Sequence, residues 1–79
     1  MIQPNEIHQM LVQAFPKAEI TVQDMTGTLD HFQIFIISNE FQNKTRIEQH
    51  RMVQAPLQTA LNDGRIHAVQ IKTAVPTKQ

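Results

Sequence analysis

The sequence predicts a small α+β domain in which two helices cover one face of a three-stranded mixed sheet, in the order α-β-β-α-β. Three patterns predict this fold: an apolar stripe at helical spacing, runs with the two-residue period of strands, and a capping sequence before a second helix. With 79 residues, the chain has room for one small core. We therefore expect a single domain over 1–79, with a loosely held tail from about residue 74.

The first half of the chain predicts a helix followed by a β-hairpin. From Pro4 to Ala14, apolar side chains recur every three or four residues, and Pro4 suits the first turn of a helix. The segment 18–24 then alternates apolar and polar side chains, as a half-exposed strand does. Turn residues around Gly27 separate it from 31–38, the most apolar run in the chain. We expect these strands to pair antiparallel, with 31–38 at the centre of the sheet.

The second half predicts another helix and a last strand. Thr45 and Glu48 have the spacing of a capping box, so we expect a helix to begin near Thr45. Pro56 is expected to kink this helix or divide it in two, because proline lacks an N–H. Gly64 suits a left-handed cap at the end of the helix, and 65–73 is the expected third strand. Because it follows a helical crossover, this strand should run parallel to the central one, which leaves one sheet face open.

Composition and pattern argue against several classes of function. The chain has no cysteine, so it has no disulfide, no thiolate metal ligand and no cysteine nucleophile of its own. Seven basic residues balance seven acidic ones, which argues against strong attraction to nucleic acid. No glycine-rich phosphate loop or nucleophile relay is present in the sequence, so we expect no enzyme. Without an apolar run of membrane-spanning length or a secretory signal, a cytoplasmic protein with no membrane partner is expected.

The four histidines are the first candidates for chemistry. His8 is expected to face solvent, and His50 to be a half-buried, hydrogen-bonded residue on the apolar stripe of the second helix, with Ile47 beside it. His31 starts the central strand, where it is either an ordinary strand-end residue or a ligand. His67 lies near the start of the last strand and is either anchored structurally or a ligand. The spacing of the histidines matches no zinc signature.

Basic residues form the second candidate site. Five of them are available to contact the phosphates of a nucleic acid: Lys44, Arg46, Arg51, Arg65 and Lys72. The first three cluster around the start of the second helix, where Glu40 and Glu48 dilute their charge. A solvated helix end is the alternative interpretation of this cluster.

Three segments together resemble the BolA family: DHFQIFIIS at 30–38, FQNKTRIEQHRMV at 41–53 and RIHAVQIKTAVP at 65–76. They match, in order, a strand after a turn ending in His-Phe, an F-x-G-K-[ST]-R turn, an R-H-R-x-V helix and an I-H-A-[LV] strand. The resemblance covers most of the chain from about Asp24 to Pro76 and is closest to the short bacterial branch. It implies a fold similar to a class II KH domain.

The resemblance also implies a function as a non-enzymatic partner of monothiol glutaredoxins. In the family, the histidine that matches His67 binds a [2Fe–2S] cluster shared with the glutaredoxin, whose cysteine and glutathione supply the thiolates. The isolated chain would bind no cofactor. The second ligand of the family comes from the loop between the first two strands, where His31 is the candidate here. The implied roles are iron–sulfur trafficking and iron or redox regulation.

The chain departs from the family's pattern at two positions. Asn43 replaces the glycine of the F-x-G-K turn and has to adopt a left-handed conformation if the turn is kept. Gln49 replaces the first arginine of R-H-R, which removes a positive charge and weakens the case for nucleic-acid binding.

Two alternative functions stay open. BolA proteins are also described as transcriptional regulators linked to stress responses, so the alternative is DNA binding through the five basic residues. The glycine loop of KH domains is missing, because Gly27 and Gly64 are too far apart to form it. The third possibility is a metal-free module that binds another protein through the open sheet face or an edge strand. A monomer or weak homodimer is expected.

Overall fold

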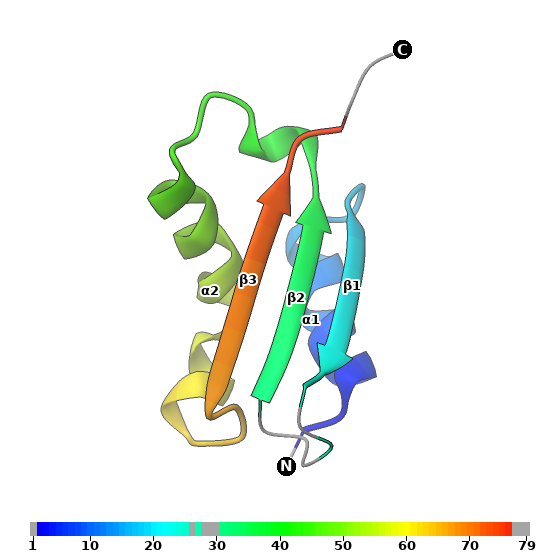
Figure 1. Ribbon diagram of the computed structural model, residues 1–79, viewed down its shortest axis with the longest axis vertical. Helices are drawn as coiled ribbons and strands as arrows, with labels where there is room; N and C mark the ends of the chain where they lie inside the picture. The colour runs from blue at the N-terminus through cyan, green and yellow to red at the C-terminus, as the bar shows by residue number, and fades with distance from the viewer. Residues whose placement is uncertain (1, 26, 28–30, 77–79) are drawn as a thin grey trace.

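A computed structural model describes residues 2–25, 27 and 31–76 of the chain, and Figure 1 shows how its elements follow one another. They are α1 (Pro4–Ala14), β1 (Glu19–Asp24), β2 (His31–Ile37), the short 3₁₀ helix η1 (Asn39–Phe41), α2 (Arg46–Asn62) and β3 (Ala68–Ala74). The predicted order α-β-β-α-β is confirmed, and η1 is an addition to it. Neither α1 nor α2 has the length and apolar character needed to cross a membrane.

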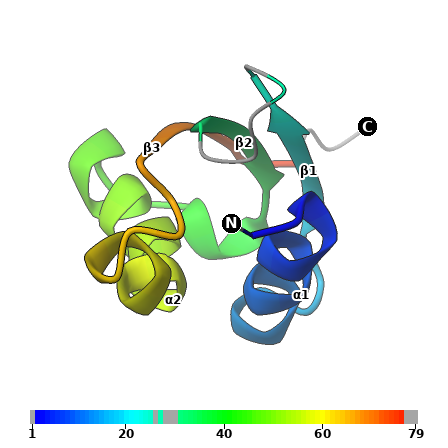
Figure 2. The same ribbon diagram turned by 90° about the horizontal axis from the view of Figure 1, so that it is seen from below.

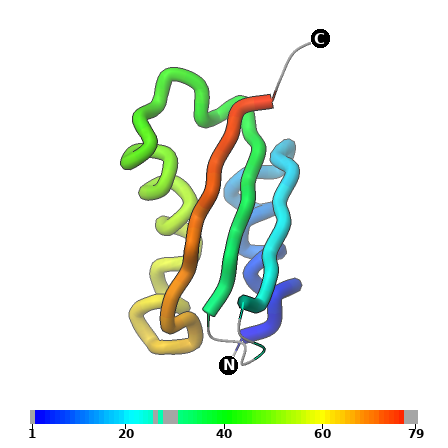
Figure 3. Tube along the Cα trace, in the orientation of Figure 1, coloured from blue at the N-terminus to red at the C-terminus, as the bar shows by residue number. Residues whose placement is uncertain are grey.

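The three strands form one mixed sheet in the order β1-β2-β3. β1 pairs antiparallel with β2, and β2 pairs parallel with β3 along its whole length, as the traces in Figure 3 show. Figure 2 shows α1 and α2 on the same side of this sheet, and no helix of the described residues lies on the other side. The predicted strand directions, the shared helical face and the open opposite face are therefore confirmed.

The core lies between the sheet and the helices. Alternate residues of β2 point into it, so Phe32, Ile34 and Ile36 are buried while the residues between them face the open side. The helices contribute their apolar stripes: Ile7 and Leu11 from α1, and Val53, Leu57 and Ala60 from α2. Ile47 does not join this stripe, because it lies in the first turn of α2 and is 65% exposed.

A capping box fixes the start of α2, as predicted. The Thr45 hydroxyl accepts from the Glu48 N–H at 3.1 Å, and the Glu48 carboxylate accepts from the Thr45 N–H at 2.8 Å. These hydrogen bonds from Thr45 lower the pKa of Glu48. Pro56 lies inside α2 and does not divide it, since the helix runs unbroken from Arg46 to Asn62. Buried residues on both sides of Pro56 pack against the core, and this packing stabilises the helix before and after the proline.

The end of α2 corrects the predicted start of the last strand. Gly64 has φ +86°, the left-handed conformation expected of it. The Arg65 N–H then donates to the Asp63 carboxylate at 3.0 Å, and the Ile66 N–H donates to the Ala60 carbonyl at 3.1 Å. Because these two N–H groups are bound to the end of the helix, the strand begins at 68 rather than at 65.

The end of the chain is held for longer than predicted. Ala74 belongs to β3, and its carbonyl accepts from the Ser38 N–H at 3.0 Å. Val75 packs against the core. The expectation of a loose tail from about residue 74 is therefore wrong for Ala74 and Val75, and residues 77–79 lie outside the described part of the chain.

Candidate functional site

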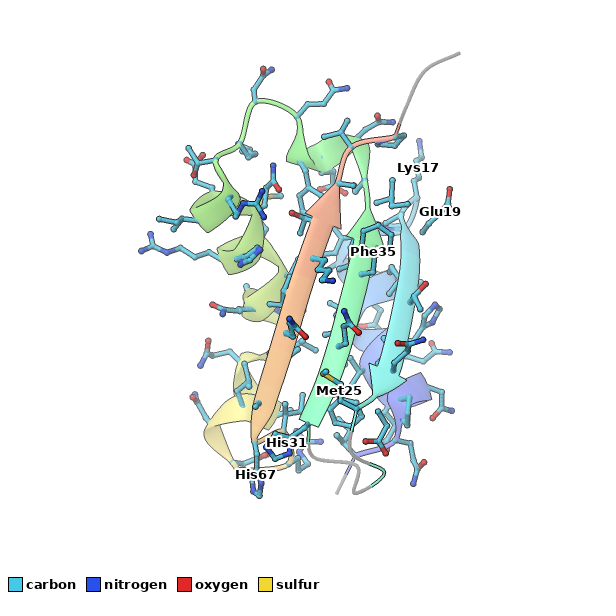
Figure 4. The ribbon with its side chains drawn as sticks, viewed as in Figure 1. Lys17, Glu19, Met25, His31, Phe35 and His67 are labelled. Atoms are coloured by element: carbon cyan, nitrogen blue, oxygen red, sulfur yellow. The ribbon has the colours of Figure 1, made fainter. Side chains whose placement is uncertain are left out.

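The structure brings together the two histidines that the sequence singled out as ligands. His31 is the first residue of β2 and pairs with Ala68, the first residue of β3. His67 directly precedes Ala68, so the parallel pairing places both imidazoles at the same end of the sheet (Figure 4). Their ring centroids are 6.1 Å apart and the rings meet edge to face, at an angle of 81°.

Neighbouring residues anchor the backbone on both sides of this histidine pair. Phe32 points into the core, and the alternation of the strand therefore turns His31 to the open face. The Met25 N–H donates to the His31 carbonyl at 2.9 Å, which extends the hairpin pairing by one residue. Ile66 is 1% exposed, so it fixes the residue before His67 in the core. The result is a half-buried His31 and an exposed His67 on well-anchored backbone.

The two imidazoles of this pair could supply two of the four ligands of a tetrahedral metal site. An imidazole nitrogen lies about 2.1 Å from a bound ion, so the centres of two imidazole rings on one tetrahedral ion lie roughly 5.3 Å apart. The observed separation of 6.1 Å is longer than this, so the two rings would have to move slightly closer together to share an ion. In the described part of the chain, no group of three or more histidine and acidic side chains is placed to hold a metal ion.

The other two histidines lie in the helical layer rather than at the strand starts. His8 is in α1 and is half-buried, which corrects the expectation that it faces solvent. His50 is half-buried in α2, as expected, but its Nε2 atom is buried without a hydrogen-bond partner among the described residues. The expected hydrogen-bonded role is therefore wrong for that nitrogen.

The five basic residues do not form one surface. Lys44 lies in the turn before α2, and Arg46 and Arg51 are exposed in its first two turns. Arg65 follows the opposite end of α2, and Lys72 alternates with the buried Ile71 and so lies on the open sheet face. The structure therefore groups three of the predicted phosphate contacts and separates two from them.

Arg65 is engaged with a carboxylate beside it. Its Nε atom lies 2.9 Å from an oxygen of Asp63, and its backbone N–H also donates to Asp63. These hydrogen bonds, the one from the Arg65 backbone first, lower the pKa of Asp63. The charge of Arg65 is thus partly neutralised by its neighbour.

Two exposed apolar side chains, one on the open sheet face and one at the histidine end of the sheet, were missed by the sequence reasoning. Phe35 lies on the open face of β2 and is 40% exposed, and Met25 follows β1 and is 53% exposed. A signal for Phe35 was present, because it lies between Ile34 and Ile36 in a strand with a two-residue period. Nothing comparable marked Met25, which follows the last residue of β1.

Comparison with known proteins agrees with this fold. Residues 5–78 match the family described as BolA-like protein. The acid stress protein IbaG of Escherichia coli is 34% identical over 74 residues, which cover 94% of this chain and 84% of IbaG. The solution structure of the BolA-like protein RP812 from Rickettsia prowazekii is 30% identical, with a TM-score of 0.74 and coverage of 96% and 97%. The BolA domain of SufE1 from Arabidopsis thaliana is 28% identical, with a TM-score of 0.83 and coverage of 92% and 91%. The chain therefore belongs to the BolA family.

Proposed function

We propose that this chain is a non-enzymatic cytoplasmic partner of a monothiol glutaredoxin and shares a glutathione-dependent [2Fe–2S] cluster with it. Its role would be in iron–sulfur trafficking or in iron and redox regulation. The observation that carries the proposal is the edge-to-face contact of His31 and His67 at the shared end of β2 and β3.

The donors of the two proteins complement each other. This chain offers imidazoles but no thiolate, because it has no cysteine. Iron–sulfur clusters are held mainly by thiolates, and these would come from the glutaredoxin cysteine and glutathione. The bound cluster supplies one-electron redox chemistry, and histidine ligation raises its reduction potential above that of an all-thiolate cluster.

The two histidines have different parts in the proposal. His67 is exposed and follows the buried Ile66, so it presents a ligand from a fixed backbone position to an approaching partner. His31 is half-buried on the neighbouring strand, where its ring meets the edge of His67. His31 is therefore proposed as the second nitrogen ligand, which also restricts the orientation of the His67 ring.

The test compares His67→Ala with His8→Ala, which removes a histidine of α1 instead. Each variant is mixed with a cluster-loaded monothiol glutaredoxin and glutathione, and the visible absorption and circular dichroism are recorded. The wild type and His8→Ala are expected to change the glutaredoxin spectrum in the same way, while His67→Ala abolishes or alters that change. An unchanged glutaredoxin spectrum with the wild type contradicts the proposal, and so does a His67→Ala variant that behaves as the wild type does.

DNA binding stays a prediction that this experiment does not address. Its own test is a salt titration of DNA affinity with Lys44, Arg46 and Arg51 replaced by glutamine. A steep loss of affinity between low and physiological salt, without sequence preference, would reduce it to general charge attraction.

A further inference from the structure

We infer that the open face of the sheet is where the thiolate-bearing partner docks, with Phe35 as the apolar anchor of the contact. This inference rests on the proposed function, because the identity of the partner comes from it. It adds the surface that would hold the two proteins together before and after a cluster is shared.

The histidine pair restricts where such a partner can lie. His31 faces the open side of the sheet, and the other side is filled by α1 and α2 (Figure 2). A molecule that brings thiolates to an ion on these imidazoles therefore has to approach over the end of the sheet or over its open face. Met25 is bound to His31 through its backbone and is 53% exposed at this end (Figure 4).

Rows of side chains cross the open face, as the strand register shows. Next to the histidine end, Gln23, Gln33 and Gln70 form a row of three amides. Phe35 follows in the next row, flanked by Thr21 and Lys72. Phe35 is four residues along β2 from His31, which is about 13 Å at the rise of a strand. A partner of ordinary domain size that reaches the histidines can therefore also cover Phe35.

A hollow lies between the row of glutamines and the row that contains Phe35. It has a volume of about 380 Å³ and is lined by Thr21, Gln23, Gln33, Phe35 and Lys72. One face of Phe35 is thus open to a side chain from another molecule, since the ring is 40% exposed. Binding energy in protein interfaces concentrates on aromatic residues that are seated in such depressions.

The charge of this face favours a protein over a nucleic acid. In the described strands, Lys72 is the one lysine or arginine that the alternation places on the open face, and Glu19 is the one carboxylate. Interface centres are depleted in charged residues and enriched in aromatic residues and methionine, which this face provides in Phe35 and Met25. A nucleic-acid surface would need several cations to displace counterions from phosphates.

The size of the face favours a transient partner over a second copy of the chain. Three strands about 4.8 Å apart and about seven residues long cover roughly 330 Å² in projection. A stable interface buries about 800 Å² on each partner. Contacts on this face alone are therefore too few for a tight dimer and are of the size that a weak, transient contact has.

The test uses two exposed apolar residues as a matched pair. Phe35→Gln changes the proposed anchor, and Ile47→Gln changes a still more exposed apolar residue on α2, outside the sheet face. Affinity for a monothiol glutaredoxin with glutathione is measured by calorimetry without a cluster, and circular dichroism checks the fold. Phe35→Gln is expected to weaken binding about tenfold or more. Ile47→Gln is expected to stay within about twofold of the wild type.

The outcomes separate this inference from the proposed function. Equal affinities of Phe35→Gln and Ile47→Gln overturn the docking surface, even if His67→Ala still removes the cluster spectrum. Loss of self-association in Phe35→Gln, measured by sedimentation, would instead assign the face to a second copy and overturn the inference. If the wild type gives no cluster spectrum but its affinity for the glutaredoxin depends on Phe35, the docking surface stands and the cluster proposal fails.

Discussion

Replacement of Gln49 by methionine tests how the turn before α2 is held. The Gln49 Nε2 atom donates to the carbonyls of Phe41 and Lys44, at 3.1 and 3.0 Å. Its Oε1 atom accepts from the hydroxyl of Thr73 on β3. One side chain thus connects the turn, the helix and the sheet. Methionine has a similar size and helix propensity, so the substitution removes mainly these hydrogen bonds.

The expected loss follows from three hydrogen bonds. Each contributes about 0.5–1.5 kcal/mol net, and the bond to Lys44 is exposed to water, so it counts at the lower end. The sum is roughly 2–3 kcal/mol in the free energy of unfolding. For a domain of this size, each kcal/mol shifts Tm by about 4–8 °C, so a fall of roughly 10–20 °C is expected.

Urea denaturation followed by circular dichroism measures this loss, and a double-mutant cycle with Thr73→Val isolates one of the bonds. The cycle should give a coupling energy of about 1 kcal/mol between Gln49 and Thr73. Gln49→Glu keeps the acceptor for Thr73 but loses the two donors, so it should also destabilise the turn. A loss below about 0.5 kcal/mol for Gln49→Met would refute the view that this side chain holds the turn.

Four further predictions concern local backbone and charge. Asn43 has φ +63°, so Asn43→Gly should keep or raise stability and Asn43→Ala should lower it by about 1 kcal/mol in urea denaturation. Thr45→Ala should cost about 1 kcal/mol at neutral pH, because it removes the hydroxyl cap of α2. The lowered pKa of Glu48 means that its stabilisation is complete above its ordinary value of 4.5 and is lost as the pH falls through the folded value. The difference in stability between the wild type and Glu48→Gln should therefore disappear in acid, and a difference that is constant with pH would contradict this. Pro56→Ala should raise Tm, since it restores an N–H inside α2, and a lower Tm would show that the proline ring contributes essential packing.

Local patterns predicted most of the fold because each one has a direct structural cause. The bounds of α1 followed from the apolar spacing and from Pro4, and the start of α2 followed from Thr45 and Glu48. The left-handed conformation of Asn43 was expected from the glycine that the resemblance places there, and its φ confirms this. These features depend on residues that are close together in the sequence, so they can be predicted from the sequence alone.

Features that depend on distant contacts were harder to predict. β3 begins later than predicted because the Ile66 N–H donates to the Ala60 carbonyl at the end of α2. No local sequence pattern predicts this hydrogen bond. Pro56 stayed inside α2 because buried residues on both sides pack against the core. In the sequence, Gln49 indicated only the loss of a positive charge. Its three hydrogen bonds in the structure show that it connects the turn before α2 to the sheet.

The candidate site was predicted in its residues but not in its geometry. The sequence indicated His67 and His31 separately, and their contact depends on the parallel register of β2 and β3. The spread of the basic residues also became visible only in three dimensions. Arg65 and Lys72 are close in sequence, yet one follows the end of α2 and the other lies on the open sheet face.

The parallel pairing of β2 with β3 has a consequence for the order of events during folding. The hairpin of β1 and β2 joins segments close in sequence, whereas β3 can pair only after the whole of α2 has been laid down between the strands. Contacts at such sequence separation form late, because the intervening chain has to be closed first. The two imidazoles take up their native positions beside each other only once β3 has paired with β2. A metal that requires both imidazoles in this arrangement would therefore bind only after that pairing has formed.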